Sequence, residues 1–308
     1  MRRFLYTEQM QNSTTNSADP KATNRAYVLF ILVVVYTFNF IDRQIVGILA
    51  VPIKADLGLT DSELGLMGGL AFALFYTGLG IPVAMLADRF SRTWIMTVAL
   101  VIWSGMTAAS GLANNFWQLF AARLGVGVGE AGGVAPAYSL ISDFFPQNHR
   151  ARAMSVYSFG IPIGSAIGIV FGGVIASMID WRWAFFIVGI AGIAVAPIFR
   201  LTIKEPPRGQ FDRKREAVKA PGLKLIVRTL ISKKSFWLLS LGASFSSMMG
   251  YGVFFWLPSF FVRSYNLTLL NASLFYGAVL LIGGLAGIWV GGWLGDRFGQ
   301  SQRSQYAR

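Results

Sequence analysis

Long apolar stretches separated by short polar segments make up most of this chain of 308 residues. Eight of these stretches are long enough to cross about 30 Å of hydrocarbon as helices of roughly 20 residues. They cover residues 26–50, 64–87, 95–112, 116–140, 153–179, 184–199, 236–262 and 272–294. The pattern therefore predicts an all-α polytopic membrane protein with about eight transmembrane helices.

The polar segments predict how the spans are grouped. Only one polar interruption between spans is long, and it is rich in lysine and arginine and contains three prolines that interrupt helices. We interpret it as a linker between two helical bundles. The predicted parts are a disordered cytoplasmic tail (1–25), an N-terminal six-helix bundle (26–199), a cytoplasmic basic linker (200–235), a partial C-terminal bundle of two helices (236–299) and a polar tail (300–308).

The charge distribution supports this topology and predicts that both termini are cytoplasmic. The formal net charge is +13, although only 13% of the residues are charged. Lysine and arginine collect in alternate loops, as they do in cytoplasmic loops, and the opposite side carries only Lys54, Arg182 and Arg263. We therefore expect a multi-pass protein of the inner or plasma membrane, surrounded by lipid bilayer, with no nucleic acid as a partner.

The composition offers little material for enzymatic chemistry. The chain has no cysteine, and its one histidine, His149, lies in a polar segment. Disulfides, thiolate metal sites and cysteine nucleophiles are excluded, and a histidine-built metal site or a Ser/His/Asp triad is disfavoured. No glycine loop carries the Lys-Ser/Thr pair of a phosphate cradle. We expect no enzyme, no metal and no cofactor, and a secondary carrier rather than an ATP-driven pump.

One tripeptide occurs twice at equivalent places. Asp-Arg-Phe stands at residues 88–90, at the end of the second span, and at residues 296–298, at the end of the eighth, each time after a run of small residues. An ordinary charged helix end explains basic residues but does not explain a repeated tripeptide. The repetition favours two structurally related halves.

These loops resemble the hallmark of the major facilitator superfamily, a Gly-x-x-x-Asp-Arg-x-Gly-Arg segment after the second span that is echoed in the second half. The first copy has Ala84 and Ser91 where the family favours glycine, whereas the second keeps Gly292 and Gly299. The resemblance implies the major facilitator fold and a cytoplasmic gate. The gate residues that it implies are Asp88, Arg89 and Arg92, with Asp296 and Arg297 in the second copy.

Four ionisable residues lie inside the predicted spans, where an unpaired charge costs several kcal/mol. Asp42 and Arg43 are in the first span, and Arg123 and Glu130 are in the fourth. At 1.5 Å per residue, Asp42 and Arg123 both lie on the order of 10 to 12 Å below the outer surface, so they can pair. Glu130 lies nearer the middle of the membrane, within reach of Arg43.

Carboxylates beside arginines suit proton coupling, because protonation of the acid frees the arginine to bind an anion. We predict Asp42 and Glu130 as proton-sensitive groups. We predict Arg43 and Arg123 as contacts for a substrate phosphate or carboxylate, which the planar guanidinium group fits. The alternative is that the four charges only neutralise one another as internal ion pairs.

Glycines crowd the same region. Five of them surround Glu130 in the fourth span, and the fifth span contains Gly160, Pro162 and Gly164. In the fourth span they allow either tight helix packing or a flexible segment, and in the fifth either a close contact or a hinge. The sequence leaves both choices open.

Three segments are similar to the spinster branch of the superfamily: residues 39–43, residues 123–131, and residues 142–146 with the Arg-Ala-Arg-Ala that follows at 150–153. The resemblance runs from about residue 27 to residue 299. It implies proton-dependent movement of lysophospholipids or sphingoid phosphates, and hence an amphipathic substrate with an anionic or zwitterionic head. The aromatic residues of the seventh span would suit an acyl chain, although they would equally suit a surface that faces lipid.

A complete member of the superfamily has twelve spans, so the resemblance implies that this chain is truncated after the eighth. We expect a proton-linked transporter of lysophospholipids or related amphipathic anions. One alternative is a proton symporter of small organic anions such as sugar acids. Another is a truncated membrane protein with an interaction role and no transport.

Overall fold

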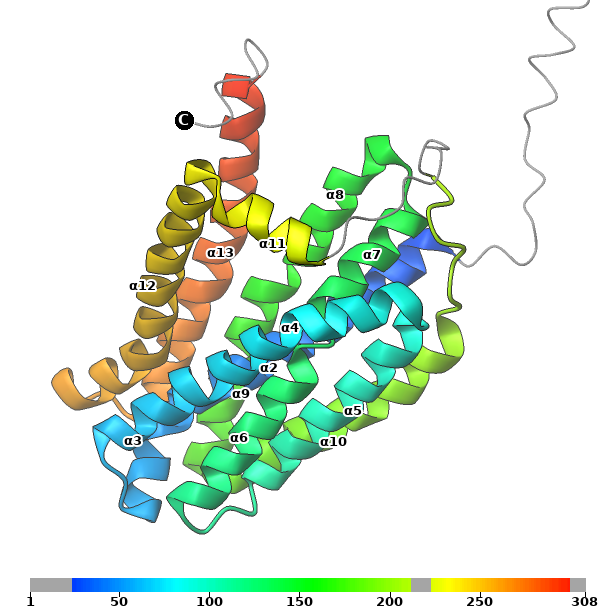
Figure 1. Cartoon of the computed structure of the whole chain (residues 1–308). Helices are drawn as coiled ribbons and strands as arrows, with labels where there is room; N and C mark the ends of the chain where they lie inside the picture. The colour runs from blue at the N-terminus through cyan, green and yellow to red at the C-terminus, as the bar shows by residue number, and fades with distance from the viewer. Residues whose placement is uncertain (1–23, 212–222, 300–308) are drawn as a thin grey trace, which may run out of the picture.

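The computed structural model describes residues 24–211 and 223–299, and these residues form helices with no β-strand among them (Figure 1). In chain order the helices are α2 (Arg25–Leu57), α3 (Asp61–Gly65), the π-helix η2 (Leu66–Ala71), α4 (Phe72–Arg89), α5 (Arg92–Ser110), α6 (Phe116–Glu130), α7 (Val134–Phe144), α8 (Gln147–Ser158), α9 (Gly160–Met178), α10 (Trp181–Thr202), α11 (Leu223–Ile231), α12 (Lys234–Ser264) and α13 (Leu269–Gly299). The all-α prediction is confirmed. The predicted tails, up to residue 23 and from residue 300, lie outside the described residues.

Seven helical segments of the described chain are long and apolar enough to cross a membrane. They are Arg25–Leu57, Asp61–Arg89, Arg92–Ser110, Gln147–Met178, Trp181–Thr202, Lys234–Ser264 and Leu269–Gly291. Each contains all or most of one predicted span, so the prediction of a multi-pass integral membrane protein is confirmed. The remaining predicted span, residues 116–140, takes a different form.

The fourth predicted span is not one continuous helix, because a turn at residues 131–133 separates α6 from α7. Glycines explain how close α6 lies to α5. A Cβ on Gly129 would come within 2.5 Å of the Trp103 backbone nitrogen, and a Cβ on Gly132 would also meet α5. Of the two roles open from the sequence, close packing is the one these glycines fill. Glu130 is the last residue of α6.

The glycines of α9 also lie in close contact with a neighbouring helix. A Cβ on Gly168 would lie 2.7 Å from the carbonyl oxygen of Ile41, and Gly164 also packs on the backbone of α2. Pro162 lies in the first turn of α9, where its missing N–H costs no intrahelical hydrogen bond. The middle of α2, which carries the ionisable residues, is therefore held directly against α9.

Two apolar clusters fill the first bundle, one above the other along α2. The first gathers around Phe40 and Trp103, and the second gathers around Ile41, Ile45 and Phe185. The boundary between the two clusters falls at residues 40–41 of α2, directly before Asp42 and Arg43. The charged layer of the protein therefore lies between two apolar layers.

Helices α12 and α13 form a pair beside the first bundle (Figure 1). α12 packs on α2, and α13 packs on α9. α11 precedes α12 within the predicted basic linker, so part of that linker is helical. Large apolar side chains of this pair, such as Leu238, Met248 and Trp289, are exposed. Surfaces of this kind need a bilayer or further helices to cover them.

Candidate functional site

Two ion pairs join α2 to α6 in the middle of the first bundle. Arg123 Nη1 donates to Asp42 Oδ1 over 2.9 Å, and Arg43 Nε donates to Glu130 Oε2 over 2.7 Å. None of the four side chains is more than 8% exposed. Arg123 and Glu130 are about two turns apart on one face of α6, so both reach α2. The two predicted pairings are confirmed.

Each carboxylate keeps one oxygen without a hydrogen-bond partner among the described residues. These atoms are Asp42 Oδ2 and Glu130 Oε1, and both are buried. Asn39, one turn before Asp42, is also buried, and within the described chain its side-chain amide has no partner either. Buried polar atoms are usually hydrogen-bonded, so these unused atoms mark a place that can accept a proton or a polar ligand.

Arg43 also contacts the second helix pair. Its Nη1 donates to the hydroxyl of Tyr251 on α12 over 3.2 Å. Its guanidinium carbon lies 4.7 Å from the ring centre of Tyr76 on α4 and 5.1 Å from that of Phe40. Cation–π contacts of this kind are worth about 0.5–2 kcal/mol. A single arginine thus links α2, α4, α6 and α12.

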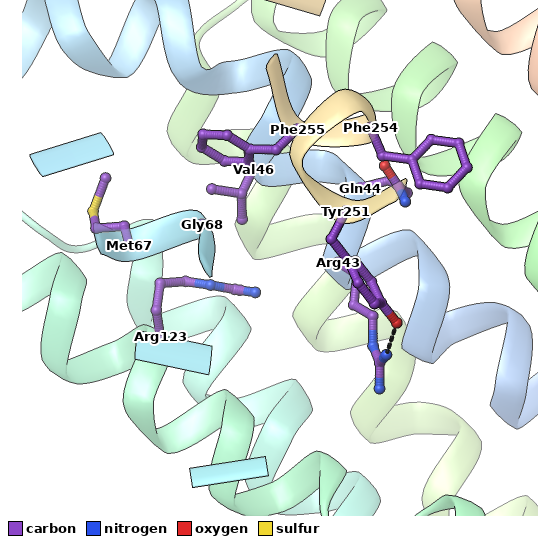
Figure 2. Close-up of a pocket in the computed structure, with 9 residues that line it drawn as sticks. All are labelled: Arg43, Gln44, Val46, Met67, Gly68, Arg123, Tyr251, Phe254 and Phe255. Carbon is purple, nitrogen blue, oxygen red and sulfur yellow. Dashed lines mark hydrogen bonds between the residues drawn. The ribbon is translucent and has the colours of Figure 1, made fainter. Parts of the chain in front are cut away.

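A cavity of about 40 Å³ lies between the two arginines and α12 (Figure 2). The residues that line it are Arg43, Gln44, Val46, Met67, Gly68, Arg123, Tyr251, Phe254 and Phe255. The paired carboxylates are not among them, so the cavity wall combines positive charge with aromatic surface. Its volume suits about one or two water molecules, so a larger ligand requires the groups that line the cavity to move apart.

A second buried cluster surrounds Arg92, the first residue of α5. Its guanidinium forms ion pairs with Asp143 of α7 and with Glu205, which follows α10, the latter over 2.6 Å. It also donates to the hydroxyl of Ser139 over 2.9 Å and to the carbonyl oxygen of Pro206 over 3.1 Å. Arg92 therefore ties α5 and α7 to the start of the linker.

The same cluster keeps Glu205 charged. Partial burial raises the pKa of the Glu205 carboxyl, but hydrogen bonds from the backbone N–H of Thr93 and the side chains of Arg92 and Ser91 outweigh burial and hold the pKa below its ordinary value. The Thr93 and Ser91 bonds are both 2.9 Å long. The carboxylate thus caps the start of α5, where the helix dipole also favours a negative charge.

The structure brings only part of the predicted cytoplasmic gate together. Arg92 is buried, whereas Asp88 and Arg89 are exposed at the end of α4 and have no ion-pair partner in the described chain. The side chains of Asp296 and Arg297 lie outside the described part of the structure. The gate therefore stays a prediction.

Asp143 and Glu205 are the partners of Arg92 that the sequence did not single out. Asp143 lies in the segment at residues 142–146 that is similar to the spinster branch. For Glu205, the sequence shows only an acidic residue within a basic linker, and this does not indicate a partner. Its contact with Arg92 spans 113 residues of sequence, a distance over which spacing predicts nothing.

Charges also connect the two helix groups at the opposite end of the molecule. Asp61 Oδ1 accepts from Lys54 Nζ over 2.8 Å and pairs with Arg263 Nη2 over 2.9 Å. Lys54 belongs to α2 and Arg263 to α12, so Asp61 bridges the first bundle to the second helix pair. Because all three side chains are well exposed, these pairs add little stability but orient the helix ends.

Residues 32–305 match the family model described as Major Facilitator Superfamily. The chain belongs to this superfamily. Among solved structures, it is similar to the crystal structure of a bacterial homolog to the human lysosomal transporter Spinster, in an inward-facing and unoccupied conformation. The TM-score is 0.79 and the sequence identity 38%, over 90% of this chain and 64% of that chain. A second structure of such a homolog, inward-facing and occupied, has a TM-score of 0.76.

Curated relatives within the superfamily point the same way. An MFS-type efflux pump of Mycolicibacterium smegmatis is 30% identical over 93% of this chain and 66% of its own length. Protein spinster of Drosophila melanogaster is 28% identical over 87% of this chain and 45% of its own length, and human Protein spinster homolog 1 is 30% identical over 78% and 46%. This chain thus spans about half to two thirds of the length of these relatives.

These similarities confirm the predicted resemblance to the superfamily and to its spinster branch. The prediction that the chain is not an enzyme is also supported, because the relatives are named as pumps, transporters or spinster proteins.

Proposed function

We propose that this chain acts in proton-linked secondary transport of lysophospholipids or related amphipathic anions. The observation that carries the proposal is the pair of buried arginine–carboxylate contacts beside a cavity that the arginines themselves line. Burying four charges at membrane depth is costly, and a purely structural role does not need arginines that reach a cavity. Membership of the superfamily and similarity to spinster proteins support the proposal.

Glu130 and Asp42 take up the proton in this scheme. A proton on Glu130 Oε1 removes the negative charge of the carboxylate, and its attraction for Arg43 falls. Arg43 then offers its charge and its donors to an anion. When the substrate leaves, the ion pair forms again and the proton is released. Asp42 and Arg123 act in the same manner.

The α12 wall of the cavity favours an amphipathic substrate over a small polar one. Tyr251, Phe254 and Phe255 line the same cavity as the two arginines, and the hydroxyl of Tyr251 accepts from Arg43 (Figure 2). A lysophospholipid presents a phosphate to the arginines and an acyl chain to these rings, as ligand sites with few polar groups and much apolar surface usually do. A sugar acid would bind the arginines but has no apolar group to pack against the aromatic rings.

The arrangement of α12 is consistent with an inward-facing state of a transporter. α12 contacts α2 through Tyr251 and through the backbone of Phe255 against Gly47, and Arg263 near its outer end pairs with Asp61 of α3. Residues nearer the start of α12, such as Trp237 and Phe245, are exposed. In alternating access, separation of α12 from α2 at the outer end would open the cavity to that side.

Proton-gradient-driven uptake of a labelled lysophospholipid into proteoliposomes tests the proposal with the full chain of 308 residues. Uptake should saturate, require the gradient and be lost in Glu130→Gln. The matched control is Asp180→Asn, which also turns an acid into an amide. Asp180 is the half-buried N-cap of α10, and asparagine caps a helix equally well, so this variant should transport normally.

Each remaining outcome assigns a different function. Gradient-driven uptake of a sugar acid without uptake of lysophospholipid would establish the small-anion symporter instead. Absence of gradient-driven uptake by a chain that is monodisperse and helical by circular dichroism would refute transport. The remaining function would then be that of a membrane protein with an interaction role and no transport.

A further inference from the structure

A groove separate from the central cavity lies between the start of α2 and the start of α8. Its volume is about 460 Å³, and its lining includes Arg25 and Leu29 of α2, Phe145, and His149, Arg152 and Val156 of α8. No carboxylate is among the described residues that line it. The groove lies at the end of the bundle that carries the Arg92 cluster, because Phe145 follows Asp143 at the end of α7 by two residues.

We propose that this groove binds one anionic phospholipid of the adjoining leaflet. The phosphate lies between Arg25, His149 and Arg152, and one acyl chain lies against Leu29 and Val156. Basic recesses between transmembrane helices attract acidic headgroups in this way, and the apolar walls exclude a ligand that is only charged.

The order of residues along both helices matches the order of groups along a lipid. Arg25 begins α2, and Leu29 follows one turn deeper on the same face. His149 and Arg152 lie in the first half of α8, and Val156 follows Arg152 one turn deeper. Each helix therefore changes from cationic to apolar as it enters the membrane, as a phospholipid changes from headgroup to acyl chain.

Local hydrogen bonds hold the two helix starts in place without using these cations. The side chain of Asn24 accepts from the Ala26 N–H over 2.9 Å and so caps α2. Arg150 Nε donates to the carbonyl oxygen of Phe145 over 3.1 Å and fixes the turn before α8.

The basic side chains that face the groove have N–H groups available to donate hydrogen bonds to a ligand. The guanidinium of Arg25 lies 5.0 Å from the ring centre of Phe211, a contact that leaves its donors available. Within the described chain, Arg152 forms no ion pair, and both it and His149 are exposed. Positive charge that is not neutralised beside an apolar wall favours an acidic amphiphile.

Native mass spectrometry of the full chain, released from detergent with added lipid, tests the proposal. Phosphatidylglycerol should be retained in preference to phosphatidylcholine with the same acyl chains. The double variant Arg25→Gln, Arg152→Gln should lower phosphatidylglycerol binding by about tenfold or more. The matched control Lys233→Gln, Lys234→Gln also removes two exposed cations, but outside the groove, and should bind as the parent does.

A second variant tests the acyl-chain part of the groove. Val156→Trp leaves the charge unchanged and fills apolar space, so it should also weaken phosphatidylglycerol binding, with thermal unfolding used to show that it folds. Equal retention in the parent and the double variant would overturn the proposal. Displacement of the lipid by millimolar inorganic phosphate, with Val156→Trp unaffected, would also overturn it and indicate a site for free phosphate. None of these readings depends on whether the chain transports.

Discussion

Arg43 donates hydrogen bonds to Glu130 of α6 over 2.7 Å and to Tyr251 of α12 over 3.2 Å. The candidate proton acceptor and the helix that would move in transport are therefore joined by one side chain. Arg43 therefore connects the charge of Glu130 to α12. In the proposed mechanism, this contact would couple protonation of Glu130 to the movement of the helix groups.

Tyr251→Phe tests that route. The variant keeps the aromatic ring in the cavity and removes the hydroxyl that accepts from Arg43. A hydrogen bond to a charged group contributes about 1.5–3 kcal/mol, so we expect gradient-driven uptake to fall by about tenfold while lysophospholipid binding is retained. Uptake and binding are measured side by side. Tyr265→Phe, at the exposed end of α12, should change neither, and an unchanged Tyr251→Phe variant would refute the route.

Arg123→Ala tests the energetic cost of the buried pair. The substitution leaves the Asp42 carboxylate buried without its partner, which typically costs 3–5 kcal/mol, or on the order of 10 °C in the thermal midpoint. The double variant Arg123→Met, Asp42→Asn should recover most of this loss, because no unpaired charge remains. The measurement is thermal unfolding in detergent.

An exposed pair provides the comparison for this prediction. Lys54→Ala removes one exposed partner of Asp61 and should cost about 1 kcal/mol or less. If the double variant at residues 42 and 123 is no more stable than Arg123→Ala, the loss comes from packing rather than from an unpaired charge.

Both buried ion pairs were predictable from the sequence, because the helical rise sets the depth of each charge. Asp42 and Arg123 match in depth, and the seven-residue spacing of Arg123 and Glu130 places both on one face. The spans were predictable for a similar reason, since the length of an apolar run must match the thickness of the hydrocarbon layer.

The remaining features depend on tertiary contacts that spacing does not encode. The turn at residues 131–133 lies where α6 approaches α5, and glycines permit that approach without requiring it. The contact of Glu205 with Arg92 depends on how the linker folds back over the bundle. The role of Tyr251 depends on where α12 lies, and several other aromatic residues follow it in the same helix.

Gly129→Ala tests the close approach of α6 to α5. The added methyl group would lie 2.5 Å from the backbone nitrogen of Trp103, which cannot move as a flexible side chain can. Overpacking of this kind costs about 1–3 kcal/mol, so the thermal midpoint should fall by several degrees. Gly78→Ala is the matched control in α4, because nothing lies within 4 Å of its added methyl group. It should be neutral or slightly stabilising, because alanine favours the helix more than glycine does, and an equal loss in both variants would mean that the contact with Trp103 does not decide the result.

Glu205→Gln tests the cluster around Arg92. The variant keeps the size of the side chain but removes the charge that accepts from Thr93 N–H, Ser91 and Arg92. Loss of charged hydrogen bonds should lower the thermal midpoint at neutral pH by several degrees. Asp88→Asn, an exposed acid without an ion-pair partner in the described chain, should leave the midpoint unchanged.

The pH dependence of the same variant gives a second, independent reading. The pKa of Glu205 in the folded protein lies below its ordinary value of 4.5, because hydrogen bonds to the carboxylate outweigh its partial burial. A carboxyl with a lowered folded-state pKa contributes stability that is fully present above the unfolded-state pKa and is lost as the pH falls through the folded-state pKa. The difference in thermal midpoint between the parent and Glu205→Gln should therefore be constant near neutral pH and shrink as the pH drops below 4.5. A difference that stays constant to low pH would show that the effect of the variant does not come from the charge of Glu205.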